Sequence, residues 1–257
     1  MKQTNSIRKA RILGSALFAL AGPGYCAESD AAVVHYDRDG FAMSVPAGWK
    51  EIPAAVLKDY MDRMAQLAPN APKQEFQGGF QLTSARQWFT YPYVLIQMRN
   101  TGRVPEGQFT KAAGIQGATE KGLKKAESQL SSILSESELT EPRYDPQKHA
   151  LFMNVSMNVA GVGKVKMTSA TLLSEKGTIS VYCYAPVDDF APYTKPFETM
   201  LDSVQLSEEL RYKPRPSDAN AVLGFLDHVG RGALRGAIIG ALVGVVIFVM
   251  RRKKAAM

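Results

Sequence analysis

The fold is decided by residues 151–185, which read LFMNVSMNVAGVGKVKMTSATLLSEKGTISVYCYA. The first nine residues alternate between apolar and mostly polar side chains, the apolar positions being Leu151, Met153, Val155, Met157 and Val159. A period of two predicts a strand with one buried face. Gly161 and Gly163 predict a turn into a second strand over 165–173, and Gly177 opens a third strand. Three successive strands with short turns predict an antiparallel meander.

The residues before this meander alternate between strand and helix patterns. A turn at 37–40 predicts a hairpin over 33–45, because Asp and Gly supply the backbone geometry of tight turns. Apolar residues at three- and four-residue intervals from Val56 to Leu67 predict a helix with one buried face. Strands are expected at 80–83 and 93–99.

Aromatic residues gather between those two expected strands. Trp88, Tyr91 and Tyr93 are a candidate binding surface, and the alternative is that the stretch caps the core.

Helical spacing returns over 109–134, most strongly over 119–134, and again after the meander. In the last helix Thr194 is the expected N-cap and Pro196 lies in the first turn, where its missing N–H costs nothing. The order of elements predicts one α+β domain over 31–208. Its antiparallel sheet is expected to have one face covered by helices.

Both ends of this domain carry a recognisable pattern. Residues 36–49 read YDRDGFAMSVPAGW and residues 197–204 read FETMLDSV. Together they resemble the two ends of a Mog1/PsbP-like domain, with a Gly-Phe strand leading to Pro-x-Gly-Trp and an aromatic-led helix ending in Ser-Val. The resemblance implies a sandwich used mostly for binding and assembly, with no shared catalytic residues to carry over.

The C-terminal residues predict a membrane anchor. A Pro-containing tether and juxtamembrane segment is expected at 209–229, and an apolar helix follows at 230–250. Its uncharged part with one further turn is about 27 Å long, which matches the hydrocarbon thickness of a thin bilayer. The basic tail at 251–257 marks the cytoplasmic end, through Arg251, Arg252, Lys253 and Lys254.

Glycine recurs at every fourth position of the expected membrane helix, at Gly232, Gly236, Gly240 and Gly244. Such a groove lets a second helix approach closely, so we expect self-association or a partner helix at this face. The alternative is that glycine is simply more frequent in membrane helices than in soluble ones.

Residues 1–27 have the pattern of a signal peptide, with a basic start, a short apolar run and small residues near a cleavage point. The apolar run is too short to span a bilayer comfortably, so cleavage is expected rather than retention. This layout predicts a single-pass protein of a bacterial inner membrane, with its domain in the periplasm and its C-terminus in the cytoplasm.

The basic character of the chain comes from these two membrane signals. They hold ten Lys and Arg residues and no acid, so a net charge of +7 becomes −3 for residues 26–230. A nucleic-acid partner is therefore not expected, because it would need a basic face on the domain.

The sequence offers no catalytic constellation. The three histidines, His35, His149 and His228, lack metal-ligand spacing, and the cysteines form no pair, so no catalytic residue, metal or cofactor is predicted. Cys183 lies on an apolar strand face and is expected to pack as a small hydrophobe. The sequence predicts a non-catalytic binding or assembly module with a possible envelope protein partner; the alternative is a small-molecule receptor or an unrecognised envelope enzyme.

Overall fold

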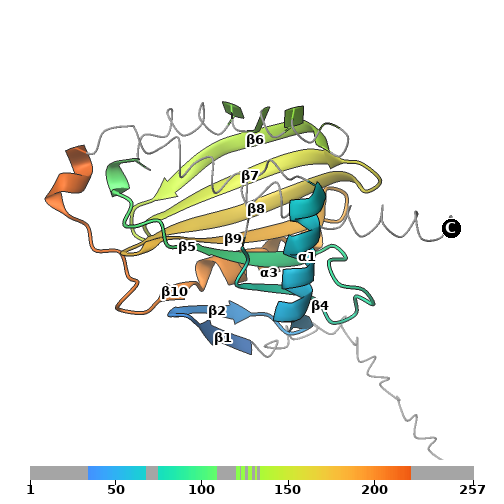
Figure 1. Ribbon diagram of the computed structural model, residues 1–257, viewed down its shortest axis with the longest axis horizontal. Coiled ribbons are helices and arrows are strands. Elements are labelled where there is room, and N and C mark those ends of the chain that lie inside the picture. Colours follow the sequence, from blue (N-terminus) through green and yellow to red (C-terminus); the bar gives the residue numbers. More distant parts are fainter. Residues whose placement is uncertain are drawn as a thin grey trace, which may run out of the picture. The chain divides into compact units, whose positions relative to one another are not determined.

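The computed structural model describes residues 34–67, 75–108 and 134–220, together with 120–121, 123–124, 127–128 and 131. Within these residues ten strands form two sheets, and every strand pair is antiparallel (Figure 1). The larger sheet has seven strands, in the spatial order β3 (Trp49–Glu51), β4 (Gly78–Leu82), β5 (Tyr93–Arg99), β9 (Gly177–Pro186), β8 (Gly163–Ser174), β7 (Ala150–Val159) and β6 (Leu134–Asp145). The predicted α+β class and the predicted meander, β7 to β9, are confirmed.

The larger sheet is covered by a helix on each face. On β5, Tyr93 and Leu95 belong to the apolar cluster that contains Leu57 of α1 (Ala54–Leu67). The intervening Val94 belongs to the opposite cluster, together with Phe197 of α3 (Thr194–Asp202). The expectation of helices on one face was therefore wrong. The central strand β9 is buried on both faces, so each face needs a cover.

Helix α1 buries the stripe that its spacing predicted. Leu57, Tyr60 and Met64 are buried, whereas Lys58 and Asp62 lie on the exposed side and pair with each other. Burying each large apolar side chain contributes about 1.5–3 kcal/mol, which holds the helix against the sheet.

The smaller sheet joins the two ends of the domain. It consists of β1 (Val34–Arg38), β2 (Phe41–Val45) and β10 (Gln205–Leu206), with β2 in the middle. The predicted hairpin is confirmed, and its turn places Gly40 at a φ of 78°. Beyond α3, the Ser203 hydroxyl accepts a hydrogen bond of 2.9 Å from the backbone N–H of Ser44. The chain thus returns to the hairpin before it leaves the sheet.

Two predicted boundaries differ from the structure. Thr194 is not the N-cap of α3 but its first helical residue, because the 3₁₀-helix η2 (Ala191–Tyr193) runs directly into α3. The cap position is Tyr193, which makes no side-chain capping bond. Leu134, expected at the end of a helix, begins β6.

The start of the segment expected to be a tether packs on the domain. Leu210 and Tyr212 are buried, and Arg211 forms an isolated β-bridge with Ser174 at the end of β8. The 3₁₀-helices η1 (Glu106–Gln108) and η3 (Pro216–Asn220) continue this contact. Among the residues that the structure describes, no helix has both the length and the apolar character needed to cross a bilayer.

Candidate binding groove

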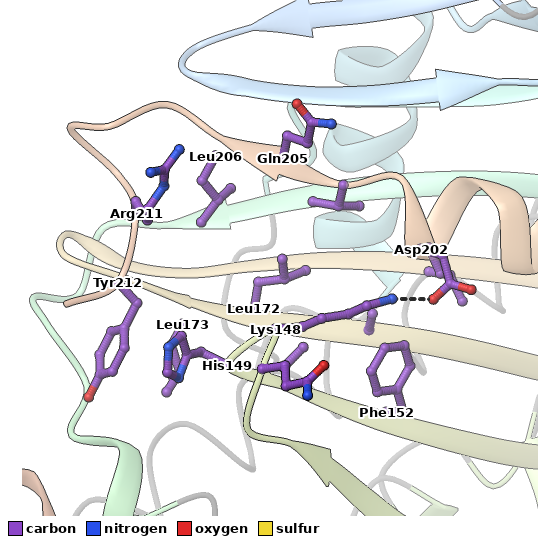
Figure 2. Close-up of a pocket in the computed structure, with 15 residues that line it drawn as sticks. Lys148, His149, Phe152, Leu172, Leu173, Asp202, Gln205, Leu206, Arg211 and Tyr212 are labelled. Atoms are coloured by element: carbon purple, nitrogen blue, oxygen red, sulfur yellow. Dashed lines mark hydrogen bonds and ion pairs between the residues drawn. The ribbon is translucent and has the colours of Figure 1, made fainter. Parts of the chain in front are cut away.

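A groove of about 410 Å³ lies between the larger sheet and the chain that follows α3. It is bounded by β7 and β8, by the end of α3, by β10 and by residues 211–212 (Figure 2). Its volume falls in the range of about 300–1,000 Å³ that is usual for small-molecule sites.

The groove has an apolar floor and walls, formed by Ala150, Phe152, Ala170, Leu172, Leu173, Leu201, Val204 and Leu206. Ala150 and Ala170 lie on neighbouring strands, and each stands opposite a larger residue: Phe152 pairs with Ala170 and Ala150 with Leu172. The two small side chains leave the space that larger ones would fill. A close-packed interior would otherwise leave few voids of this size.

Polar side chains form the rim, namely Gln147, Lys148, His149, Asp202, Gln205, Arg211 and Tyr212. Lys148 reaches from the turn before β7 to the end of α3, where its Nζ lies 2.5 Å from Asp202 Oδ1. Figure 2 shows this ion pair at one end of the groove. The two side chains are 38% and 61% exposed, so the pair is weak and can open at little cost.

Arg211 lies at the other end of the groove in the same view (Figure 2). Its guanidinium pairs with Glu208 at 2.8 Å, and Glu208 is not among the lining residues. Beside it the rings of His149 and Tyr212 pack with their centroids 5.1 Å apart. His149 Nδ1 also lies 3.2 Å from Glu106 Oε1, which fixes the ring at the groove wall.

Behind this wall a buried ion pair holds the C-terminal segment to the sheet. Arg103, in the loop after β5, donates to both carboxylate oxygens of Asp218 at 2.7 and 2.6 Å and to Glu175 at 2.9 Å. The guanidinium lies 4.4 Å from the centre of the Tyr212 ring, whose hydroxyl donates to Asp218 at 2.9 Å. We call Arg103, Glu175, Tyr212 and Asp218 the Arg103 cluster.

In the Arg103 cluster, Tyr212 and Asp218 are buried, whereas Arg103 and Glu175 are partly exposed. The hydrogen bonds from Arg103 hold the pKa of the Asp218 carboxyl well below its usual range, so Asp218 is ionised at neutral pH. Burial raises the pKa of the Tyr212 hydroxyl, which therefore stays a donor. These four residues hold Tyr212, which lines the groove, in position.

The aromatic stretch predicted as a candidate binding surface lies elsewhere, at the apolar cluster of α1. Tyr93 has no exposed surface and stacks on Tyr91 with ring centroids 4.8 Å apart. Trp88 and Tyr91 are partly buried against the same cluster, and Lys50 Nζ lies 5.0 Å from the Trp88 ring centre. None of the three lines the groove. A binding role for this stretch stays a prediction, in which only Trp88 and Tyr91 are partly exposed.

The other predicted sites lie outside the described residues. They are the signal segment 1–27, the glycine positions Gly232, Gly236, Gly240 and Gly244, and the basic positions Arg251, Arg252, Lys253 and Lys254. Cys183 is described and is fully buried, and burial raises the pKa of its thiol. Its predicted role as a small hydrophobe is confirmed.

Sequence reasoning did not find the groove, because no motif marks it. Its lining side chains come from β7, β8, α3 and β10, from the turn before β7 and from the chain after β10, and they meet only through the pairing of β7 with β8 and the return of the chain after α3. One signal was available. Leu210 and Tyr212 are apolar and aromatic residues within an otherwise polar, Pro-containing segment, which indicates that the segment packs against something.

No family model and no curated protein matches the chain. Among solved structures it is similar to cyanobacterial PsbP from Synechocystis, with 12% identity and a TM-score of 0.45 over 73% of this chain and 98% of that one. It is also similar to the Ran-binding protein Mog1p of Saccharomyces cerevisiae, with 8% identity and a TM-score of 0.39 over 68% and 96% of the two chains.

A third similar structure is LpqN of Mycobacterium tuberculosis, which is involved in cell envelope biogenesis. It shares 12% identity with a TM-score of 0.36, over 68% of this chain and 90% of that one. The resemblance predicted from the two ends of the domain is to the domain type that PsbP and Mog1p name. It concerns the fold and supplies no site residue.

Proposed function

We propose that this protein is a membrane-anchored periplasmic binding module that acts without catalysis, and that the groove is its binding site. The observation that carries the proposal is the groove itself. It is concave, its floor is apolar, and its few polar groups stand at the rim, which is the usual composition of a binding site.

The rim residues form ion pairs between separate segments of the chain. Lys148 pairs with Asp202 across one end, and His149 pairs with Glu106 in the wall. Among the described lining residues these contacts join chain segments, and none sets a nucleophile beside a base. This arrangement favours binding over catalysis.

The anchor is proposed from the sequence. The apolar run at 230–250 followed by four basic residues is the pattern of a membrane helix with a cytoplasmic C-terminus, and residues 1–27 have the pattern of a signal that directs the domain to the periplasm. The Arg103 cluster adds a mechanical link, because it ties residues 212–218 to the sheet next to the groove. A force applied to the proposed anchor would therefore be transmitted to Tyr212 in the groove wall.

The topology is tested by thiol labelling of the full-length protein in spheroplasts. Lys58→Cys places a thiol on the exposed side of α1, and Lys254→Cys places one in the basic tail. A membrane-impermeant maleimide should label the first variant at once and the second only after permeabilisation. Cys183 is buried and does not interfere. Immediate labelling of Lys254→Cys, or protection of Lys58→Cys, would refute the proposed topology.

Self-association through the glycine repeat is a further part of the proposal. Packing of small residues drives helix association in lipid, so Gly236→Leu with Gly240→Leu should reduce crosslinked dimers in native membranes. Leucine at Ala241 and Val245 is the matched control, since in the expected helix these positions would follow the glycines by one residue and face away from the glycine stripe. Equal crosslinking in all variants would remove the glycine interface from the proposal.

The groove also favours the alternative of a small-molecule receptor. Its volume suits a small ligand rather than a broad protein surface. The chemistry of the rim indicates which ligand that is.

A further inference from the structure

We infer that the groove binds a single-chain anionic amphiphile, such as a medium-chain carboxylate, with its head group at Arg211 and its chain along the apolar floor. This inference rests on the proposed function, because it names the ligand class of the same groove.

The shape of the floor favours a slender chain. Ala150 and Ala170 lower the floor, while Leu172 and Leu206 stand beside it. Figure 2 places Leu172 and Leu206 between Arg211 and the Lys148–Asp202 pair, so the apolar stretch runs between two polar ends. A flexible alkyl chain can follow such a floor without presenting a polar group to it.

The charges at the two ends are not equivalent. Lys148 is neutralised by Asp202, the one carboxylate among the lining residues. Arg211 has its partner, Glu208, outside the lining. Lys213 Nζ also lies 3.2 Å from Glu208, so Glu208 keeps a partner when the guanidinium turns toward a ligand. The Arg211 end can therefore take up one negative charge.

The head group follows from the chemistry of arginine. A guanidinium offers parallel N–H donors that match a carboxylate or phosphate in two simultaneous hydrogen bonds. The His149 and Tyr212 rings line the groove beside this end. At the opposite end the Lys148–Asp202 pair sets a limit to chain length. Affinity should rise about fourfold for each added methylene until the chain reaches that pair.

The test uses the full-length protein in native membranes and a photoactivatable laurate, a 12-carbon carboxylate with a diazirine at its methyl end. After illumination, the labelled peptides are identified by mass spectrometry. Label is expected within residues 147–152 and 201–206, which line the groove. Unlabelled laurate should compete, whereas dodecanol, which lacks the charge, and butyrate, which lacks the chain, should not.

Two variants separate the head-group contact from the floor. Arg211→Gln should lower groove labelling about tenfold, whereas the matched control Arg63→Gln, which removes an exposed arginine of a similar ion pair on α1, should leave it unchanged. Ala170→Leu should abolish labelling by filling the floor. Since this larger residue can also disturb the sheet, the trypsin pattern of the variant is compared with that of the wild type. If the two patterns differ, the labelling of Arg211→Gln alone is used as the test.

Three results would overturn the inference: label confined to residues 230–250, groove labelling unchanged by Arg211→Gln, or competition by dodecanol equal to that by laurate. The topology assay fails independently. If the maleimide labels the domain but the laurate probe does not label the groove, only the ligand class is refuted. If the laurate probe labels the groove but the domain is protected from the maleimide, only the periplasmic location is refuted.

Discussion

Replacing Asp218 with Asn should release the C-terminal segment from the domain. Asp218 accepts two hydrogen bonds from Arg103, one from the Tyr212 hydroxyl and one from the backbone N–H of Arg215. An Asn amide keeps one acceptor oxygen and turns an NH₂ group toward these donors. Arg103 is then left with a buried charge and without its nearest partner.

The size of the effect follows from burial. The side chains of Arg103 and Asp218 are 13% and 6% exposed, so solvent screens the pair little. Breaking a buried ion pair from one side costs about 3–5 kcal/mol. Glu175 remains bonded to Arg103 and offsets part of this cost, so we expect a loss near the lower end, about 3 kcal/mol. For a domain of this size that lowers Tm by about 6–12 °C.

Thermal unfolding of the full-length protein, followed by near-UV circular dichroism, measures this loss, and trypsin reports on the segment directly. In this stretch Lys213 and Arg215 precede proline, so release of the segment exposes the bond after Arg211 to the protease. The matched control is Asp62→Asn, which breaks an exposed pair on α1 and should cost below about 0.5 kcal/mol. The contrary result is a Tm of Asp218→Asn that lies within about 1 °C of the Tm of Asp62→Asn, which is the size of the control's own effect. If this is found, and no new trypsin cleavage is seen, the Arg103 cluster does not hold the segment.

Three further outcomes are expected. Gly177→Ala should prevent folding, because its Cβ would overlap the carbonyl oxygen of Arg99, whereas Gly163→Ala, also at positive φ but in open space, should cost about 1 kcal/mol in urea unfolding. Cys183 should react with a maleimide only after unfolding, because burial encloses the thiol and raises its pKa; reaction at the free-thiol rate in the folded protein would contradict this. The pKa of Asp218 is lowered on folding, so its contribution to stability should be complete above about pH 4 and lost as the pH falls below it. The urea midpoint of the wild type should therefore approach that of Asp218→Asn near pH 2, which is about two units below the unfolded-state pKa of Asp. A difference between the two midpoints that stays constant with pH would contradict this prediction.

Periodicity predicted the elements with one buried face. Strand β7 and helix α1 each present a single apolar stripe, so their patterns identified them directly. Strand β6 was missed because it is an edge strand with two irregularities in its pairing. Its sequence LSESELTEPRYD is mostly polar and lacks a regular apolar alternation, so its pairing with β7 defines it more than its own residues do.

The groove could not be predicted, because it depends on positions far apart in the chain. Lys148 and Asp202 carry no local signal, and their ion pair forms only when α3 folds over the ends of β7 and β8. The Arg103 cluster likewise joins residues separated by 115 positions. The sequence indicated the aromatic stretch at Trp88 as a candidate binding surface, yet its most buried member, Tyr93, packs in the core. Composition marks a core aromatic and a binding aromatic in the same way.

The groove is proposed to be the part of this protein that binds. A photocrosslinking amino acid placed at Gln205, which is exposed on the groove rim, tests it most directly when the full-length protein is illuminated in native membranes and its adducts are identified by mass spectrometry. The same amino acid at Lys58, on the exposed side of α1, is the control. One defined adduct is expected from position 205, absent from position 58 and lost in Ala170→Leu. Identical adducts from both positions, or an adduct at 205 that survives the filled floor, would contradict it.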